Sequence, residues 1–457
     1  MPRSGPDISG TAEIFFAQVF RPCDSSSEDP SRCLVGRIMH QMTPTAVSDL
    51  DRLVDASIGR YTAFLQQLLT IPTPRMCEHE AVRFVGKAFA AAGLEPEYFE
   101  GEGIGEPTPH GLPLNLFAAR PGAGGGRSLL LEAHMDTVPP GDESRWEGGP
   151  WSGRIEGGRI YARGAHDDRV GVAMLWMTAD LLKQLGVVTA GDLYFLVTTE
   201  EEYSAGGMRA YLKRPGRVRP DAHLAVDGNQ AHYAIVGHAA ALTFEIRIPG
   251  GWGSLFHRKP EAETNPIELA AKLLGSLHDF ESEVRRRLAA LEPDPRWPAP
   301  FVAATQIQSR GWFSNVPEEC SISGFANLFP PMTIPEYREL LEQWVGKWSR
   351  DFNWLRSRPP VIEWGPLEVP FLLTPETSDF YRALADCHQK SFGAPLRPRH
   401  MGGWGDMRLL GCPNLIFYGP GGGGGDHNYN EYFELADLAP MLKTLASLAL
   451  EWSGTRP

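Results

Sequence analysis

A histidine and an aspartate, His134 and Asp136, stand at the end of an apolar run at residues 128–133. A short apolar run that ends in polar residues predicts a buried strand of a parallel sheet, and open α/β sheets bind their ligands beyond the carboxyl ends of such strands. Residues two apart on an extended chain point the same way, so the carboxylate can orient the imidazole while its other nitrogen binds a metal. Alone, the pair also fits a surface histidine beside a surface aspartate.

Four further clusters of acidic or histidine side chains follow along the chain, and each comes just after an apolar, strand-like run. They lie at residues 164–168, 198–202, 225–228 and 419–428. A hydrolytic site with two metal ions needs about four or five nitrogen and oxygen ligands, including one shared carboxylate. The clusters supply such a set. Histidine and carboxylate ligands without cysteine suit zinc, cobalt or manganese.

This ordered series resembles the dinuclear zinc amidohydrolase and peptidase family that includes aminoacylase, acetylornithine deacetylase, succinyl-diaminopimelate desuccinylase and the glutamate-releasing carboxypeptidases. The resemblance covers nearly the whole chain after about residue 50. It implies two Zn²⁺ per subunit, with Co²⁺ or Mn²⁺ as substitutes. The metal ligands that it implies are Asp167 as the bridge, His134 and Asp227 at one metal, and Glu202 and His427 at the other. Asp136 is then expected to orient His134.

The triple glutamate at residues 200–202 needs an assignment within this resemblance. The family pattern has two glutamates before a segment of small residues, matched here by residues 203–207, which makes Glu201 the general base and Glu202 the ligand. A water between two zinc ions loses a proton near neutral pH, and Glu201 then passes that proton to the leaving amine. The reaction is amide hydrolysis by a zinc-bridged hydroxide. Asp168 is interpreted as a helix N-terminal acid.

The elements that must position these residues alternate between strand and helix, which predicts a mostly parallel α/β sheet covered by helices. We expect this catalytic domain at residues 49–236 and 367–457. Residues 237–366 show a β-α-β-β-α-β pattern typical of a ferredoxin-like α+β unit. The resemblance makes this insertion a lid that carries a homodimer interface. Residues 1–48 lack hydrophobic periodicity and are predicted to be a mobile extension. The alternative is that translation starts later, at Met39 or Met42.

Two features of the predicted lid concern the substrate. His257 matches the family's lid histidine, which donates a hydrogen bond to the oxyanion in the partner's site; the alternative is a surface histidine packed against its aromatic neighbours. Asn315 matches the family's lid asparagine, but Asn327 stands where the family has a carboxylate-binding arginine. The guanidinium group that would bind a carboxylate through two parallel hydrogen bonds is therefore missing at this position. Arg408, or else Arg310, is the candidate replacement, and the alternative is a substrate without an α-carboxylate. We expect ordinary N-acetyl amino acids to be poor substrates.

Other histidines and the late glycines have simpler interpretations. His166, beside the predicted bridge, is expected to lie behind the ligands or on the surface. His232, His238 and His400 have no motif support. The glycine run at residues 421–425 is predicted to be a mobile loop that lets His427 reach the metal.

Bulk composition narrows the class of protein. A formal net charge of -13 and a pI near 5.5 argue against nucleic acid or an anionic membrane as a partner. The six cysteines have no paired spacing, which favours a reduced compartment. No apolar run has the length of a membrane span, and residues 14–20 lack the features of a secretory signal, so we expect a cytoplasmic protein.

The sequence leaves three functions open. The first is a deacylase that cleaves the amide bond of a small N-acyl amino acid or related metabolite. The second is a metallo-exopeptidase acting on short peptides. The third is a binding protein that keeps this fold without catalysis.

Overall fold

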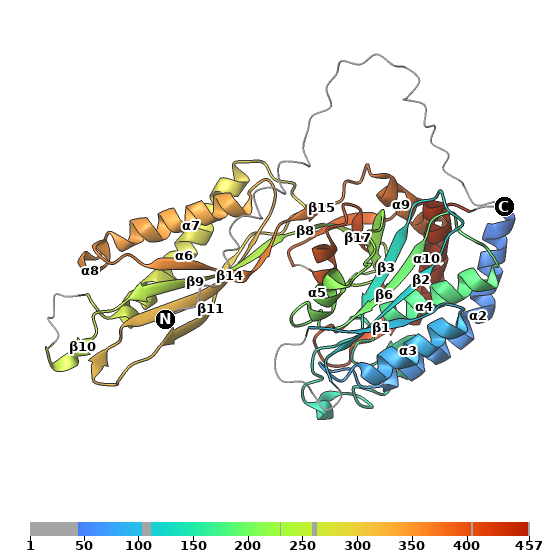
Figure 1. Cartoon of the computed structure of the whole chain (residues 1–457), viewed down its shortest axis with the longest axis horizontal. Helices are drawn as coiled ribbons and strands as arrows, with labels where there is room; N and C mark the ends of the chain where they lie inside the picture. Colours follow the sequence, from blue (N-terminus) through green and yellow to red (C-terminus); the bar gives the residue numbers. More distant parts are fainter. Residues whose placement is uncertain (1–43, 103–110, 229, 258–262, 404, 456–457) are drawn as a thin grey trace, which may run out of the picture. The chain divides into compact units, whose positions relative to one another are not determined.

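The computed structural model describes residues 44–102, 111–228, 230–257, 263–403 and 405–455 (Figure 1). Helix α2 (Pro44–Thr70) begins ahead of residue 49, where the catalytic domain is predicted to start. The rest of the predicted N-terminal extension lies outside the described residues. No described helix has the length and apolar character needed to cross a membrane.

A nine-stranded sheet forms the larger part of the structure. Its strands, in order, are β1 (Glu97–Glu100), β2 (Leu114–Arg120), β6 (Leu193–Thr198), β3 (Leu129–His134), β7 (Ala222–Ala225), β17 (Leu415–Phe417), β8 (Tyr233–His238) and β15 (Leu372–Leu373), with β16 (Arg397–Met401) also paired to β8. The strands from β6 to β17 are parallel, while β1, β2 and β15 run antiparallel to their neighbours. The carboxyl ends of β6, β3 and β7 therefore meet at one edge.

Helices bury both faces of this sheet. One face packs against α2, α3 (His79–Ala91), α4 (Arg169–Gln184), α9 (Asp379–Phe392) and α10 (Leu438–Ser453), and the other packs against α5 (Gly206–Lys213). Strand β3 shows why three leucines stand in succession in its sequence. Leu129 and Leu131 belong to the first core, whereas Leu130 belongs to the second.

An antiparallel four-stranded sheet forms the inserted unit. Its order is β11 (Val302–Ser309), β13 (Glu319–Leu328), β9 (Ala240–Pro249) and β14 (Val361–Val369), and its helices are α6 (Pro266–Ala289), α7 (Ile334–Ser349) and the short α8 (Asn353–Arg356). This is the ferredoxin-like arrangement. Asn265 caps α6, and Thr333 with Glu336 forms a capping box at α7. The predicted fold class, a helix-covered α/β sheet with this insertion, is confirmed.

The ends of these strands place the insertion slightly later than the predicted 237–366. Gly237 and His238 still belong to β8 of the large sheet, where they pair with β15 and β16. Strand β14 continues to Val369 and pairs with β9. The inserted sheet therefore runs from Ala240 to Val369.

Short strands and 3-10 turns complete the described structure. The strands are β4 (Arg154–Glu156), β5 (Arg159–Tyr161), β18 (Gly423–Gly424) and β19 (Tyr432–Glu434) in one antiparallel sheet, and β10 (Gly253–Ser254) with β12 (Asn315–Val316) in another. The turns are η2 (Glu143–Arg145), η3 (Leu255–His257), η4 (Asp406–Leu410) and η5 (Leu435–Asp437). Because Gly423 and Gly424 pair with β19, the glycine run at 421–425 contains a strand, which differs from the predicted mobile loop.

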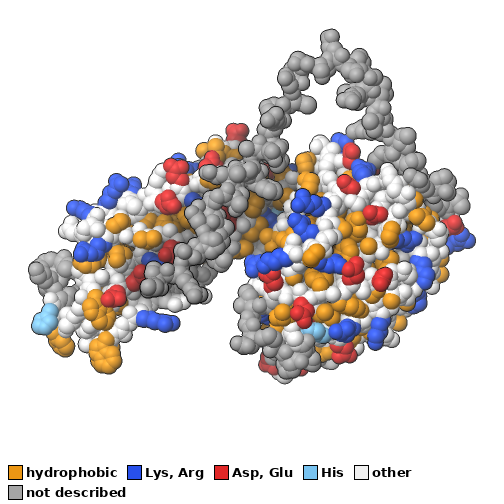
Figure 2. Space-filling model, viewed as in Figure 1, with side chains coloured by type: hydrophobic (Ala, Val, Ile, Leu, Met, Phe, Trp, Pro, Cys, Tyr) orange, Lys and Arg blue, Asp and Glu red, His pale blue; other side chains and the backbone are white. Residues whose placement is uncertain are grey.

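The β10 end of the inserted unit exposes apolar side chains. Figure 2 shows orange side chains gathered at this end of the inserted unit. The exposed residues near β10 and β12 are Trp252, Leu255, Phe256, Trp312 and Phe313. Phe256 and Phe313 are 87% and 85% exposed, and the Trp312 and Phe313 rings lie 4.6 Å apart.

Candidate metal centre

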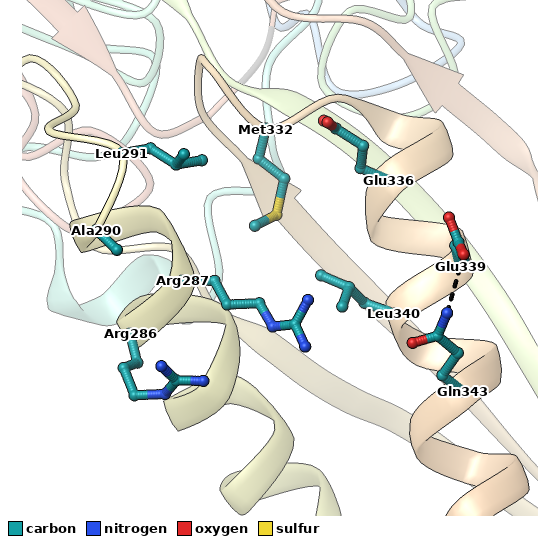
Figure 3. Close-up of a pocket in the computed structure, with 9 residues that line it drawn as sticks. All are labelled: Arg286, Arg287, Ala290, Leu291, Met332, Glu336, Glu339, Leu340 and Gln343. Carbon is teal, nitrogen blue, oxygen red and sulfur yellow. Dashed lines mark hydrogen bonds between the residues drawn. The ribbon is translucent and has the colours of Figure 1, made fainter.

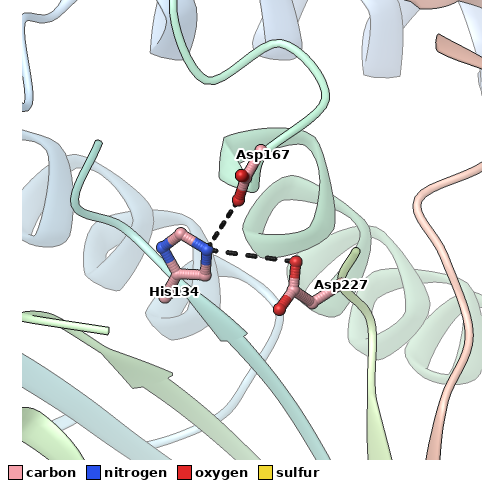
Figure 4. A group of neighbouring side chains, drawn as sticks. All are labelled: His134, Asp167 and Asp227. Carbon is pink, nitrogen blue, oxygen red and sulfur yellow. Dashed lines mark hydrogen bonds and ion pairs between the residues drawn. The ribbon is translucent and has the colours of Figure 1, made fainter. Parts of the chain in front are cut away.

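Three predicted ligands converge at the carboxyl edge of the large sheet (Figure 4). His134 ends β3, Asp167 lies just before α4, and Asp227 follows β7. His134 Nε2 lies 2.9 Å from Asp167 Oδ1 and 3.9 Å from Asp227 Oδ1. Potential ligand atoms of all three fall within 4.8 Å of one another. This spacing suits a single metal ion.

The other two predicted ligands meet Asp167 from its opposite oxygen. His427 Nε2 lies 3.1 Å from Asp167 Oδ2 and 3.0 Å from Glu202 Oε1. Asp167 therefore turns Oδ1 towards His134 and Oδ2 towards His427. A carboxylate with one oxygen in each group has the geometry of a bridging ligand.

The main-chain oxygen of Asp136 orients His134. His134 Nδ1 lies 3.0 Å from that oxygen and 3.5 Å from the Asp136 carboxylate. A proton on Nδ1 leaves the Nε2 lone pair available to a metal. The carboxylate itself accepts hydrogen bonds from the main-chain N–H groups of Glu201 and Glu202, each at 3.2 Å. Asp136 thus fixes the glutamate loop against the end of β3.

The three glutamates have separate environments. Glu200 is fully buried and is held by Arg75, whose Nε and Nη2 donate to its two oxygens at 2.7 and 2.9 Å. Glu201 Oε1 accepts from the main-chain N–H of Asp406 at 3.4 Å. Glu202 alone joins the ligand groups. This division supports Glu201 rather than Glu202 as the proton-transfer residue.

The pKa shifts of these groups indicate that the site contains too little positive charge to balance its carboxylates. Burial raises the pKa of Glu201 well above its usual range, with His134 opposing and Asp406 adding to the shift. Burial also raises the pKa of Asp227 to about 7. Hydrogen bonds to Asp167 and Glu202 raise the pKa of His427 to about 10. Divalent cations would supply the positive charge that the site lacks, so the set of donor atoms fits a pair of metal ions.

The lid residues predicted for the site lie on the inserted unit. His257 is exposed in η3, and Asn315 in β12 pairs with Ser254 of β10 close by. Among the described residues, no hydrogen bond or ion pair joins His257 or Asn315 to the five ligands. Their roles stay predictions.

The candidate carboxylate-binding residues have structural partners. The Asn327 side chain accepts from the Phe301 N–H at 2.7 Å and donates to the Gly402 carbonyl at 3.1 Å. Arg408 is buried and its Nη1 donates to the Ala239 carbonyl at 2.5 Å, while its Nη2 has no partner within the described residues. Arg310 is exposed in the loop after β11.

Several buried residues lie behind the proposed ligands, and the sequence analysis pointed to only some of them. Glu431 and Arg163 form a buried ion pair next to the Asp167 loop. His166 is 2% exposed, so of its two predicted places, behind the ligands or on the surface, the structure agrees with the first. Asp168 stands at the α4 N-terminus as predicted, and its Oδ2 accepts from the His134 N–H at 3.2 Å. His166 and Asp168 could be noticed from the sequence because they flank Asp167, whereas the Glu431–Arg163 pair depends on tertiary contact.

A separate hollow of about 390 Å³ lies between α6 and α7 of the inserted unit (Figure 3). Arg286 and Arg287 line it from α6, and Glu336 and Leu340 line it from α7. None of the predicted ligands lines this hollow.

A family model for peptidase family M20/M25/M40 matches residues 130–451. The chain belongs to this family. An N-formyl-4-amino-5-aminomethyl-2-methylpyrimidine deformylase of Halalkalibacterium halodurans is 25% identical over 353 residues, which cover 72% of this chain and 80% of that protein. A succinyl-diaminopimelate desuccinylase of Paraburkholderia xenovorans is 23% identical over 404 residues, which cover 83% and 95%.

The solved structures agree with this family assignment. A dinuclear metal-binding peptidase of family M20 from Bacillus subtilis aligns with a TM-score of 0.60 at 17% identity, over 87% of this chain and 99% of that chain. The family and reaction class predicted from the sequence are confirmed: this M20 protein is a metal-dependent hydrolase of amide or peptide bonds.

Proposed function

We propose that this M20 hydrolase is a deacylase with two zinc ions, and that it removes a small acyl group from an amine that lacks an α-carboxylate. The observation that carries the substrate class is Asn327. Both ends of its amide are engaged, with Phe301 and Gly402, at the position where the family resemblance places a carboxylate-binding arginine. The Asn327 amide is neutral, and both its oxygen and its nitrogen already form hydrogen bonds. It therefore cannot bind a carboxylate through two parallel hydrogen bonds as an arginine does.

Two further observations support this substrate class. The Arg408 guanidinium is buried and bonded to Ala239, so it is a poor replacement for the missing fork. One relative, the Halalkalibacterium halodurans protein, carries the name of a deformylase acting on an aminomethylpyrimidine. A formyl or similarly small acyl group is therefore the first candidate.

The metals are proposed from the donor set. Asp167, His134, Asp227, Glu202 and His427 supply nitrogen and oxygen atoms and no sulfur, which favours zinc, with cobalt or manganese as substitutes. When bound, the two ions polarise the amide carbonyl and lower the pKa of a water molecule to about 7.

The chain's own groups complete the proposed mechanism. Glu201 takes the proton from the attacking water and delivers it to the departing amine nitrogen. Asp136 holds the Glu201 and Glu202 main chain and so fixes the distance between base and ligand. His257 of a second subunit donates a hydrogen bond to the oxyanion.

A homodimer and a cytoplasmic location belong to the same proposal. Strand β11 is an edge strand of the inserted sheet, and its middle residues are exposed, which leaves an edge available for pairing. Cys77, Cys320, Cys387 and Cys412 are unpaired thiols, which supports a reducing compartment.

The test is a substrate panel on zinc-loaded enzyme. We expect N-formyl amines without a carboxylate to have the highest kcat/KM, and N-acetylornithine and N-succinyl-diaminopimelate to fall below the usual enzyme range of about 10⁴ to 10⁸ M⁻¹s⁻¹. Chelation should abolish activity, and zinc or cobalt should restore it. Efficient turnover of either carboxylate substrate contradicts the proposed class, and a preference for dipeptides favours the exopeptidase.

A further inference from the structure

Glu431 is a fully buried glutamate just before β19 that accepts hydrogen bonds from the loop carrying Asp167. Its Oε1 accepts from the main-chain N–H groups of His166 and Asp167, at 2.8 and 3.0 Å. Its Oε2 accepts from the Gly164 N–H at 2.9 Å and from Arg163 Nη1 at 2.6 Å. Each oxygen therefore receives two donors, which offsets the cost of burying the carboxylate.

The same group of side chains also holds the residues on both sides of His427. Arg163 Nη2 donates to the carbonyl of Asn428 at 3.0 Å. His166 Nδ1 lies 2.7 Å from Asp426 Oδ1, and its Nε2 lies 3.0 Å from the Gly421 carbonyl. His427 itself has φ of 57°, a left-handed conformation that a histidine keeps only when its surroundings hold it.

Close packing makes this arrangement specific to a glycine. A Cβ on Gly423 would come within 2.3 Å of His166 Cδ2, so only glycine lets the His166 ring lie against this segment. The loop that carries Asp167 and the loop that carries His427 are thus fixed to each other as well as to Glu431.

We propose that Glu431 is a positioning residue that holds Asp167 as a bridging ligand and, through Arg163 and His166, sets the His427 loop against it. The ligands of the two metal positions are then held in place by one network of hydrogen bonds. This inference rests on the proposed two-metal function.

The experiment compares Glu431→Gln with Glu434→Gln. The amide of Glu431→Gln sets an N–H₂ group against two donors whichever way it turns. Glu434 is the matched control because it lies three residues after Glu431, at the end of β19, and pairs with Arg159 Nε at 2.7 Å, without a side-chain bond to the Asp167 loop among the described residues. The readouts are Zn²⁺ stoichiometry, Zn²⁺ affinity by chelator competition, and kcat and KM at saturating zinc.

We expect Glu431→Gln to bind zinc about 10- to 100-fold more weakly, as for other groups that support metal ligands, and Glu434→Gln to bind as the wild type does. Saturating zinc should restore most of kcat with KM unchanged, which a merely unstable fold would not show. Equal affinity in Glu431→Gln and wild type overturns the inference. A wild type that binds no zinc instead overturns the proposed function.

A second variant serves if Glu431→Gln does not fold, as judged by circular dichroism. Arg163→Lys keeps the charge but cannot reach both Glu431 and Asn428, because an ammonium is a single point donor. We expect its zinc affinity to fall in the same direction, and an unchanged affinity overturns the proposal.

Discussion

Three consecutive glutamates at the end of β6 receive different neighbours, and their neighbours indicate different tasks. Glu200 is paired with Arg75 and Ser204, so its charge is used within the protein. Glu202 faces His427 and belongs to a ligand group. Within the described residues, Glu201 accepts one long hydrogen bond, from the main-chain N–H of Asp406, and this freedom is what the proposed role of proton carrier requires.

This division predicts opposite outcomes for two similar variants. Glu201→Gln should retain about two zinc ions while kcat falls about a hundredfold to ten-thousandfold, because only the proton transfer is removed. Glu202→Gln should lose zinc, because a neutral amide is a weak ligand. Metal analysis after desalting, together with kcat, distinguishes them. The reverse pattern would move both assignments by one residue.

The grouping of the proposed ligands could be predicted from sequence, as could the place of Asp168 behind them, whereas the place of Glu431 could not. His134 ends β3, and Glu202 and Asp227 follow β6 and β7, and these parallel strands bring their ends together whatever the details of packing. Glu431 has no such signal, since it is one acid in a polar stretch and its donors at residues 163–167 are distant in sequence. Its role depends on tertiary contact.

At the scale of elements, the long helices and buried strands could be predicted from hydrophobic periodicity and capping residues. Asn265 and Thr333 each accept from the helix that they begin, as their types predict. Strands β16 and β18 were missed for a physical reason. One is the polar, proline-containing segment Arg397–Met401 and the other is Gly423–Gly424, and both become strands only because β8 and β19 offer paired edges.

Helix α9 carries a histidine that should make stability depend on pH. His388 Nδ1 lies 2.7 Å from Tyr418 Oη, and its Nε2 lies 3.1 Å from His232 Nδ1. Burial, with His232 adding to it, lowers the pKa of His388 to about 4. The unfolded chain takes up this proton near its ordinary pKa of about 6.5, so the unfolded state binds more protons between these two values.

The free energy of unfolding should therefore be highest above about pH 6.5 and should fall as the pH drops towards about 4. His388→Gln keeps a partner for Tyr418 and should flatten this part of the curve. Denaturant unfolding between about pH 7 and pH 4.5 provides the measurement, with exposed His278→Gln on α6 as the control. Parallel curves for wild type and His388→Gln would contradict the assignment.

At the scale of the whole molecule, the metal ligands and the lid residues belong to separate sheets. The proposed ligands follow strands of the nine-stranded sheet and of the small β18-β19-β5-β4 sheet, whereas His257 and Asn315 lie at the β10 end of the inserted unit. The apolar side chains beside His257, among them Phe256 and Phe313, are exposed on this chain. The proposed homodimer predicts that a second subunit covers this end and that His257 acts in the site of that subunit.

Subunit mixing tests this arrangement. His257→Ala should cost about a hundredfold to a thousandfold in kcat through the lost oxyanion donor, and Glu201→Gln should be nearly inactive. In a hybrid dimer, the site with an intact Glu201 receives an intact His257 from its partner. An equal mixture should therefore recover about a quarter of wild-type activity, since half of the randomly formed dimers are hybrids with one working site each. A mixture that stays inactive after confirmed subunit exchange, or an active monomer, would show that His257 does not act across subunits.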